Sequence, residues 1–185
     1  MPTVQRTHVE VYVFRRIGQR IEHLCLRRSS SAKKLPGVWQ PVTGKVEVFE
    51  QSLEAAVREV REETGLSPLR WWALESVSVY FDPLHDTVRL LPMFAAEVGS
   101  RDDVKLSREH QDFEWLSAKA FGSRVLWEMQ RRGLEALQRE VLASARLADA
   151  LDVTGPAGRW QKSGPPKKLA SAKGGGSRPR RRITG

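Results

Sequence analysis

The chain has 185 residues, of which 40% are hydrophobic and 29% are charged. This length and balance favour one globular domain with a substantial core. No run approaches the ~18 consecutive apolar residues of a membrane span, and the first six residues lack the apolar core of a signal peptide. We therefore expect a cytoplasmic protein without membrane association. Cys25 is the one cysteine, which excludes an internal disulfide and a cysteine-rich metal site; its apolar surroundings predict a small core residue.

The formal net charge of +9 is unevenly distributed along the chain. Residues 153–185 hold nine of the 31 basic residues and no acidic one, which leaves 22 basic against 22 acidic residues in 1–152. The C-terminal segment is rich in Gly and Pro and poor in apolar residues. We therefore predict a folded domain over 1–152 and a basic, disordered tail over 153–185. Such a tail can make weak contacts with nucleic acid, although most basic tails only add solubility.

Hydrophobic alternation predicts a series of strands at residues 9–14, 21–26, 69–81, 87–98 and 113–116. Residues 38–44 read as an extended segment, and a turn at 82–86 makes the two long strands antiparallel. From about 123 to 151 the pattern is helical, with Gly133 as a candidate interruption. A mixed sheet with one helix before residue 65 and another near the C-terminus predicts an α/β fold, an α/β/α sandwich.

A helix is predicted just before Gly65, which is a stop signal. Its apolar stripe has the i, i+3, i+4, i+7 spacing and consists of Leu53, Ala56, Val57 and Val60. Glu59, Glu62 and Glu63 share the neighbouring sector, where they repel one another unless a divalent cation lies between them. Clustered carboxylates suit Mg²⁺. The alternative is a solvated acidic face, supported by pairing of Glu54 with Arg58.

The stretch from Gly44 to Leu66 resembles the Nudix box of the Nudix hydrolase family at every defining position of the box. The resemblance extends over about residues 5–145 and implies the Nudix fold and cleavage of a diphosphate linkage. It implies Mg²⁺, or alternatively Mn²⁺, bound by Glu59, Glu62, Glu63 and the backbone carbonyl of Thr43. It also implies structural roles in the box for Gly44, Glu50 and Arg58. Gly44 is expected to allow a close backbone approach or a special dihedral angle.

A second segment, Leu106-Ser107-Arg108-Glu109-His110, is similar to a Ser/Thr-x-Glu-His segment of several Nudix subfamilies. There the glutamate points into the metal site, so Glu109 is a candidate ligand or general base. The alternatives are a box glutamate as the base and a purely local capping role for Glu109. His110 is expected to orient its neighbours rather than do chemistry.

Phosphate binding is predicted for Arg27 and Arg28, at the end of a strand, and for Lys45 in the box loop. Trp39 and Gln40 are predicted to line the substrate pocket, with the Trp39 ring available to stack on a base or pterin. A core role for Trp39 is equally compatible with the sequence. The remaining tryptophans with expected core or interface roles are Trp71, Trp72, Trp115 and Trp127.

The run from Arg27-Arg28 through Trp39-Gln40 to the box, together with Glu109-His110, resembles the dihydroneopterin triphosphate pyrophosphohydrolase group, which also acts on dATP. This implies a nucleoside or pterin triphosphate substrate cleaved to a monophosphate and pyrophosphate. Phe49 departs from the pattern, because a glycine usually precedes the box glutamate, and is expected to stiffen and crowd the loop. The alternatives are hydrolysis of dinucleoside polyphosphates, nucleotide sugars or RNA ends, or a non-catalytic Nudix-fold regulator. A monomer and a homodimer are both compatible with the sequence.

Overall fold

The structure, a computed structural model, describes residues 3–161. Within this range the strands form one eight-stranded mixed sheet in the order β1-β7-β2-β3-β4, with β5 on β2, β6 on β7 and β8 on β3. Strand β7 runs parallel to β1 and β2 and antiparallel to β6. The strands are β1 (Thr3–Arg6), β2 (His8–Ile17), β3 (Arg20–Arg28), β4 (Trp39–Gln40), β5 (Val42–Lys45), β6 (Arg70–Asp82), β7 (Thr87–Val98) and β8 (His110–Leu116).

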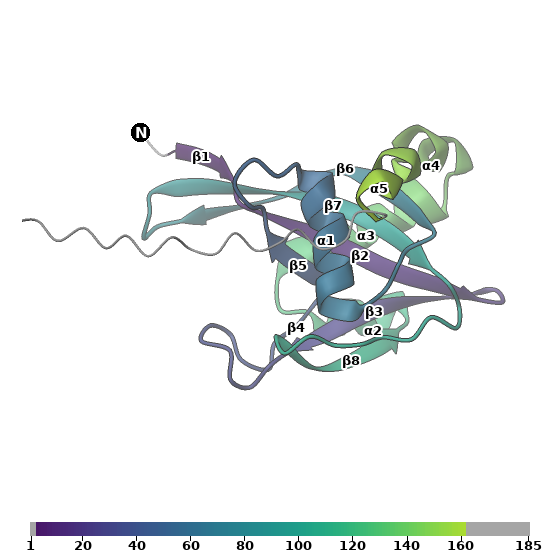
Figure 1. Cartoon of the computed structure of the whole chain (residues 1–185), viewed down its shortest axis with the longest axis horizontal. Coiled ribbons are helices and arrows are strands. Elements are labelled where there is room, and N and C mark those ends of the chain that lie inside the picture. The colour runs from purple at the N-terminus through teal and green to yellow at the C-terminus, as the bar shows by residue number, and fades with distance from the viewer. Residues whose placement is uncertain (1–2, 162–185) are drawn as a thin grey trace, which may run out of the picture.

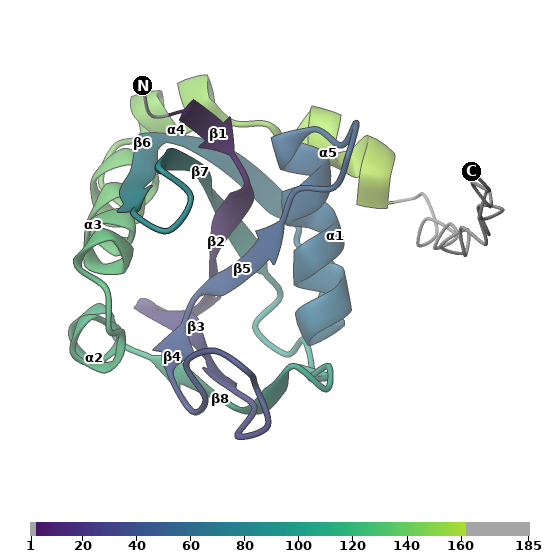
Figure 2. The ribbon, with the colours of Figure 1, turned by 90° about the vertical axis from the view of Figure 1, so that its left-hand side faces the viewer.

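Helices cover both faces of the sheet, so the predicted α/β/α sandwich is confirmed (Figures 1 and 2). One face carries α1 (Ser52–Thr64) and α5 (Thr154–Gln161). The opposite face carries α2 (Ala118–Arg124), α3 (Glu128–Leu137), a π-helical turn (Gln138–Leu142) and α4 (Ala145–Leu151). None of the helices within residues 3–161 combines the length and the apolar character needed to cross a bilayer.

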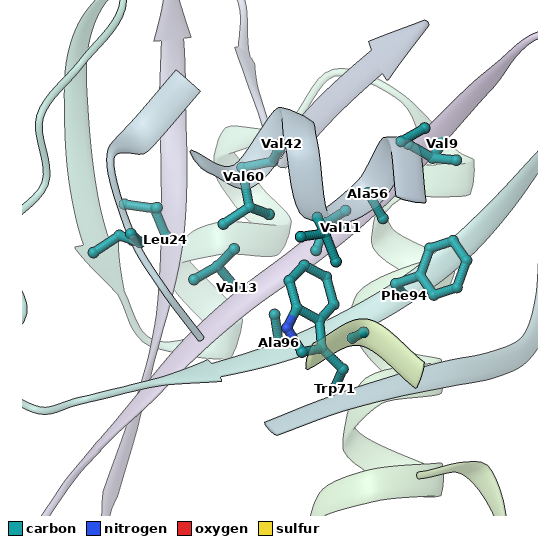
Figure 3. Packing of buried hydrophobic residues seen from close by; sticks show 14 of the residues in the cluster. Val9, Val11, Val13, Leu24, Val42, Ala56, Val60, Trp71, Phe94 and Ala96 are labelled. Carbon is teal, nitrogen blue, oxygen red and sulfur yellow. The ribbon is translucent and has the colours of Figure 1, made fainter. Parts of the chain in front are cut away.

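Successive side chains of β2 point to opposite faces of the sheet, so this strand contributes to the core on both faces. Val9, Val11 and Val13 are buried on the α1 face, where Figure 3 shows Val11 between α1 and Trp71. Tyr12 and Phe14 are buried on the other face, in the cluster that also holds Cys25 and Trp72. The core positions predicted for Cys25, Trp71 and Trp72 are therefore observed, whereas Trp127 is half-exposed.

The helical pattern predicted from about 123 to 151 is confirmed for most of that range, but its start and its interruptions lie elsewhere than predicted. The chain is helical from Ala118, breaks at Val125, and then forms α3, the π-helical turn and α4. Ser117 begins α2 because its hydroxyl accepts the N–H of Ala120 at 3.3 Å, a capping signal. Gly133 does not interrupt α3: a Cβ there would lie 2.0 Å from the Tyr12 hydroxyl oxygen, so glycine allows α3 to pack closely on β2.

The disordered tail predicted from residue 153 is also wrong at its start, because residues 154–161 form α5. Val153, Ala157 and Trp160 have i, i+4, i+7 spacing and pack against the core beneath α1. The Val153 N–H donates to the Trp71 carbonyl at 2.9 Å and anchors the helix. Composition averaged over 33 residues hid this short apolar stripe. The rest of the predicted tail, and the nucleic-acid contact proposed for it, lie outside the described residues.

Packing of α5 leads to a stability prediction. Ala157 is fully buried, so Ala157→Leu should lower the free energy of unfolding by about 1–3 kcal/mol through overpacking. Gly158→Ala in the same helix is the matched control, because a Cβ at Gly158 meets no atom within 4 Å. Thermal unfolding of both variants is the measurement. Equal melting temperatures would contradict the packing of α5 on the core.

Candidate active site

Helix α1 is defined at both ends by its own residues. Gln51 and Glu54 form a capping box at the N-terminus, in which the Gln51 N–H donates to Glu54 Oε2. Gly65 ends the helix with φ +69° and donates its N–H to the Arg61 carbonyl at 2.9 Å. The Glu54 carboxylate accepts the Gln51 N–H, and Arg58 binds other residues in place of the expected pairing with Glu54.

Arg58 joins the box loop to the helix. Its guanidinium donates to both carboxylate oxygens of Glu50, at 2.8 and 3.0 Å, and to the Lys45 carbonyl at 2.8 Å. The Glu47 N–H also donates to Glu50, at 2.8 Å. Burial alone would raise the pKa of Glu50, but the hydrogen bonds from Arg58 and Glu47 outweigh it and hold that pKa below its ordinary value. The loop is thus fixed against α1 by a bidentate ion pair.

Gly44 lies directly against Glu59. A Cβ at Gly44 would be 1.9 Å from Glu59 Cδ and 2.2 Å from Oε1. Because its φ lies outside the left-handed region, Gly44 is needed here for close approach and not for a special dihedral angle.

Glu63 is almost fully buried beside β5. Burial raises its pKa well above the ordinary value, and the charges of Glu59 and Glu109 raise it further; Arg28 and a backbone hydrogen bond from Thr43 act against this. Since the N–H and C=O of a strand residue point to the same edge, the Thr43 carbonyl also points toward the Glu63 side of β5.

The pKa of Glu59 is also raised, to about 7. Burial is the largest cause; the ion pair with Arg58 opposes it, and the charges of Glu62 and Glu109 add to it. Three carboxylates of α1 and that of Glu109, in the loop after β7, therefore lie close enough for their charges to interact.

The loop after β7 is attached to the C-terminal end of α1. Lys105 N–H donates to the Thr64 carbonyl at 2.7 Å, and Ser107 N–H donates to the Glu63 carbonyl at 3.1 Å. These contacts satisfy helix carbonyls that have no partner within α1. They also bring Glu109 close enough for its charge to raise the pKa values of Glu59 and Glu63.

The carboxylates fit a hard cation chemically, but they are not arranged as a ready ligand shell. Within residues 3–161 no three His, Cys, Asp or Glu side chains lie in positions that could hold a metal ion as they stand. Arg58 Nη1 binds one oxygen of Glu59 at 2.7 Å and one oxygen of Glu62 at 3.3 Å, which leaves the other oxygen of each carboxylate for a cation beside Glu63. One carboxylate oxygen of Glu63, Oε2, is buried without a hydrogen-bond partner, which fits an oxygen-binding cation such as Mg²⁺.

The predicted phosphate-binding cations fall on different faces of the sheet. The positive charge of Arg28 lowers the pKa of Glu63, so the Arg28 side chain lies on the α1 side of the sheet. Arg27, its neighbour in the strand, points to the other side, where its Nε donates to the Gly37 carbonyl at 3.4 Å. Lys45 is the register partner of His8 and follows Gly44, so it also points away from the carboxylates. The structure brings Arg28, and not Arg27 or Lys45, to the carboxylate side.

The Trp39 ring is not an open stacking platform in this structure. The guanidinium carbon of Arg124 lies 4.9 Å from its ring centroid, and that of Arg27 lies 5.9 Å away. Gln40 is mostly buried and donates to the Thr43 hydroxyl at 2.9 Å. A stacked base would have to displace one of the two arginines.

The expectation that Phe49 crowds the box loop is wrong, because its side chain is fully exposed. Its backbone has φ +67°, which explains why glycine usually stands at this position.

Two polar residues were missed by sequence reasoning, one beside the box loop and one on the sheet face opposite α1. Arg6 donates to the Ser52 hydroxyl at 2.9 Å and to the Glu50 carbonyl at 3.1 Å, and so ties β1 to the start of α1. Glu10, the register partner of Thr43, is buried and accepts a hydrogen bond from Tyr12 at 3.0 Å. An acidic residue inside an apolar strand run was the signal that could have identified Glu10.

Burial raises the pKa of Glu10 to about 7, although the Tyr12 hydrogen bond opposes the shift. A raised pKa in the folded state means that the contribution of Glu10 to stability is fully present below the ordinary pKa near 4.5 and is lost as the pH rises through about 7. Glu10→Gln should therefore stabilise the protein by about 2 kcal/mol at pH 8 and have little effect at pH 4. Thermal unfolding of both proteins across this pH range is the measurement, and parallel pH profiles would contradict the prediction.

Comparisons with known proteins agree with this arrangement. The family described as the NUDIX domain matches residues 5–145. The chain is 29% identical over 111 residues to the asymmetrical bis(5'-nucleosyl)-tetraphosphatase of Caenorhabditis elegans, covering 56% of this chain and 72% of that protein. A C. elegans Ap4A hydrolase crystal structure has a TM-score of 0.63 at 22% identity, with 74% of this chain and 98% of that chain covered.

A further similar structure is the Escherichia coli dihydroneopterin triphosphate pyrophosphohydrolase, with a TM-score of 0.57 and 22% identity over 76% of this chain and 96% of that one. At such identities the structural likenesses show the fold, whereas the family match covers most of the chain. The chain belongs to the NUDIX domain family and is a hydrolase that acts on phosphoric anhydrides.

Proposed function

We propose that this protein hydrolyses a phosphoric anhydride linkage in a nucleoside polyphosphate, with Mg²⁺ or Mn²⁺ held by Glu59, Glu62, Glu63 and the Thr43 carbonyl. The observation that supports this most is the buried Glu63 carboxylate, whose Oε2 lacks a partner and whose charge is opposed by Glu59 and Glu109. A cation at this position would remove the repulsion. When bound, it would offset the negative charge of the phosphates and acidify water at the site.

The surrounding residues have separate roles in this proposal. Glu109 lies near Glu59 and Glu63 and would take the proton of the attacking water as general base. Arg28, on the same face, would bind a phosphate oxygen. Arg58 holds the loop and keeps Glu59 and Glu62 within reach of the site. Gly44 leaves the space that the Glu59 side chain occupies.

The first candidate substrate class is dinucleoside polyphosphates, supported by the likeness to the C. elegans tetraphosphatase over 72% of that protein's length. The second is dihydroneopterin triphosphate or dATP, supported by the Arg27-Arg28, Trp39-Gln40 and Glu109-His110 pattern. The arginines around Trp39 weigh against the second class, since they occupy the ring on which a single base or pterin would stack.

Product analysis with Mg²⁺ separates these classes. The panel contains diadenosine tetraphosphate, dihydroneopterin triphosphate, dATP and ADP-ribose, each incubated with the wild-type protein and with Glu62→Gln. Turnover of the tetraphosphate to AMP and ATP by the wild type alone supports the first candidate. Release of pyrophosphate and a monophosphate from the triphosphates supports the second. Turnover of none of them, with metal bound, would overturn both and favour a non-catalytic regulator.

A further inference from the structure

Three side chains from different elements have buried polar atoms without a hydrogen-bond partner near the C-terminal end of α1. They are Oε2 of Glu63 on α1, both ring nitrogens of His110 on β8, and Nε of Arg28 on β3. His110 Nε2 lies 4.0 Å from Glu63 Oε2, and the two side chains are only 1% and 5% exposed. Arg28 and His110 are register partners, so they are neighbours across the two strands.

Such an arrangement is costly unless the groups form hydrogen bonds. A buried polar group without a partner loses the hydrogen bonds it would make to water, and most buried polar side-chain atoms in folded proteins therefore have partners. The 4.0 Å separation exceeds a hydrogen bond by about 1 Å. A rotation of the Glu63 side chain that brings its carboxylate about 1 Å closer to the imidazole would make this contact a hydrogen bond.

We propose that His110 is a positioning residue for Glu63, donating its Nε2–H to Glu63 Oε2. The Thr43 N–H also donates to this carboxylate. The two hydrogen bonds together would fix the orientation of the Glu63 carboxylate and leave oxygen lone pairs for a cation. This inference rests on the proposed function, in which Glu63 is a metal ligand. Hydrogen bonds to ligating carboxylates are a common means of fixing metal ligands. Arg28 then keeps its terminal N–H groups available for phosphate.

His23 provides a matched control within the same fold. It is also buried, with Nδ1 lacking a partner, but its ring packs edge-on against Phe121 at a centroid distance of 6.2 Å. His23 lies on the α2 and α3 side, in β3, away from Glu63. Replacing His23 therefore tests the loss of a buried imidazole without the loss of a carboxylate contact.

The experiment measures Mn²⁺ affinity of the substrate-free protein by calorimetry, with thermal unfolding as the check of folding. His110→Ala should weaken Mn²⁺ binding about 10–100-fold. His110→Gln should bind nearly as the wild type does, because its amide N–H reaches the position of Nε2. His110→Asn, whose amide is shorter, should bind like the alanine variant. His23→Gln should leave the affinity unchanged.

The order of affinities among the His110 variants tests the positioning role, even where one of them folds poorly. Equal affinity for all His110 variants, or a glutamine variant as weak as the alanine variant, would overturn it. If Glu63→Gln lowers Mn²⁺ affinity while the His110 variants do not, the positioning role fails and the proposed function stands. If Glu63→Gln binds Mn²⁺ as the wild type does, both fail.

Discussion

Glu63→Gln is expected to abolish hydrolysis and, at the same time, to stabilise the metal-free protein. Glu63 is 4% exposed, and its charge is opposed by burial, Glu59 and Glu109. Glutamine keeps an oxygen to accept the Thr43 N–H but carries no charge. Loss of a metal ligand removes several kcal/mol of transition-state stabilisation, so activity should fall on the order of 1000-fold.

The stability change has a defined pH dependence. Because the pKa of Glu63 is raised in the folded state, the contribution of Glu63 to stability is fully present below pH 4.5 and is lost as the pH rises through the folded pKa. The variant should therefore melt at the same temperature as the wild type at pH 4 and several degrees higher at pH 8, without metal. Glu62→Gln is the comparison: Glu62 is 44% exposed, so this variant should lose activity with little change in melting temperature. A lower melting temperature for Glu63→Gln in metal-free buffer at pH 8 would contradict the account.

Gly44→Ala is expected to inactivate the enzyme while leaving the protein folded. The added methyl would lie 1.9 Å from Glu59 Cδ, so the Glu59 side chain or the β5 backbone must move. A misplacement of about 1 Å in a catalytic constellation can lower the rate about 100-fold. The measurement is kcat/KM on the preferred nucleotide, together with far-UV circular dichroism.

Gly122→Ala is the control for this substitution. Gly122 lies in α2, and a Cβ there meets no atom within 4 Å, so activity should be unchanged and stability equal or slightly higher. Wild-type activity of Gly44→Ala would show that the close approach of β5 to Glu59 is not required for the reaction.

The box helix could be predicted from sequence because the information is local. The spacing of Leu53, Ala56, Val57 and Val60 identifies one buried stripe, and Gly65 stops the helix within the same stretch. The fold class followed from the order of strands and helices. Glu109 could be placed near the box only through the resemblance, because its position depends on backbone contacts to α1 that lie far away in sequence.

The sequence did not indicate on which face of the sheet neighbouring side chains lie, nor which helices are stabilised by packing against distant parts of the chain. Arg27 and Arg28 were assigned one role, yet consecutive strand residues point to opposite faces and only Arg28 reaches the Glu63 side. Lys45 points away from the carboxylates for the same reason, since it follows Gly44, and its phosphate-binding role stays a prediction. The helix α5 escaped prediction because its short stripe is stabilised by Trp71 and α1, more than 80 residues away in sequence.

The most direct test of the central claim is the rate of nucleotide hydrolysis as a function of Mg²⁺ concentration, for the wild type and Glu62→Gln. We expect the wild-type rate to vanish in EDTA, to rise to saturation with Mg²⁺, and to be restored by Mn²⁺. Glu62→Gln should stay near the background rate at every concentration. A wild-type rate that is unchanged by EDTA, or a Glu62→Gln rate equal to that of the wild type, would contradict a metal site built on the α1 carboxylates.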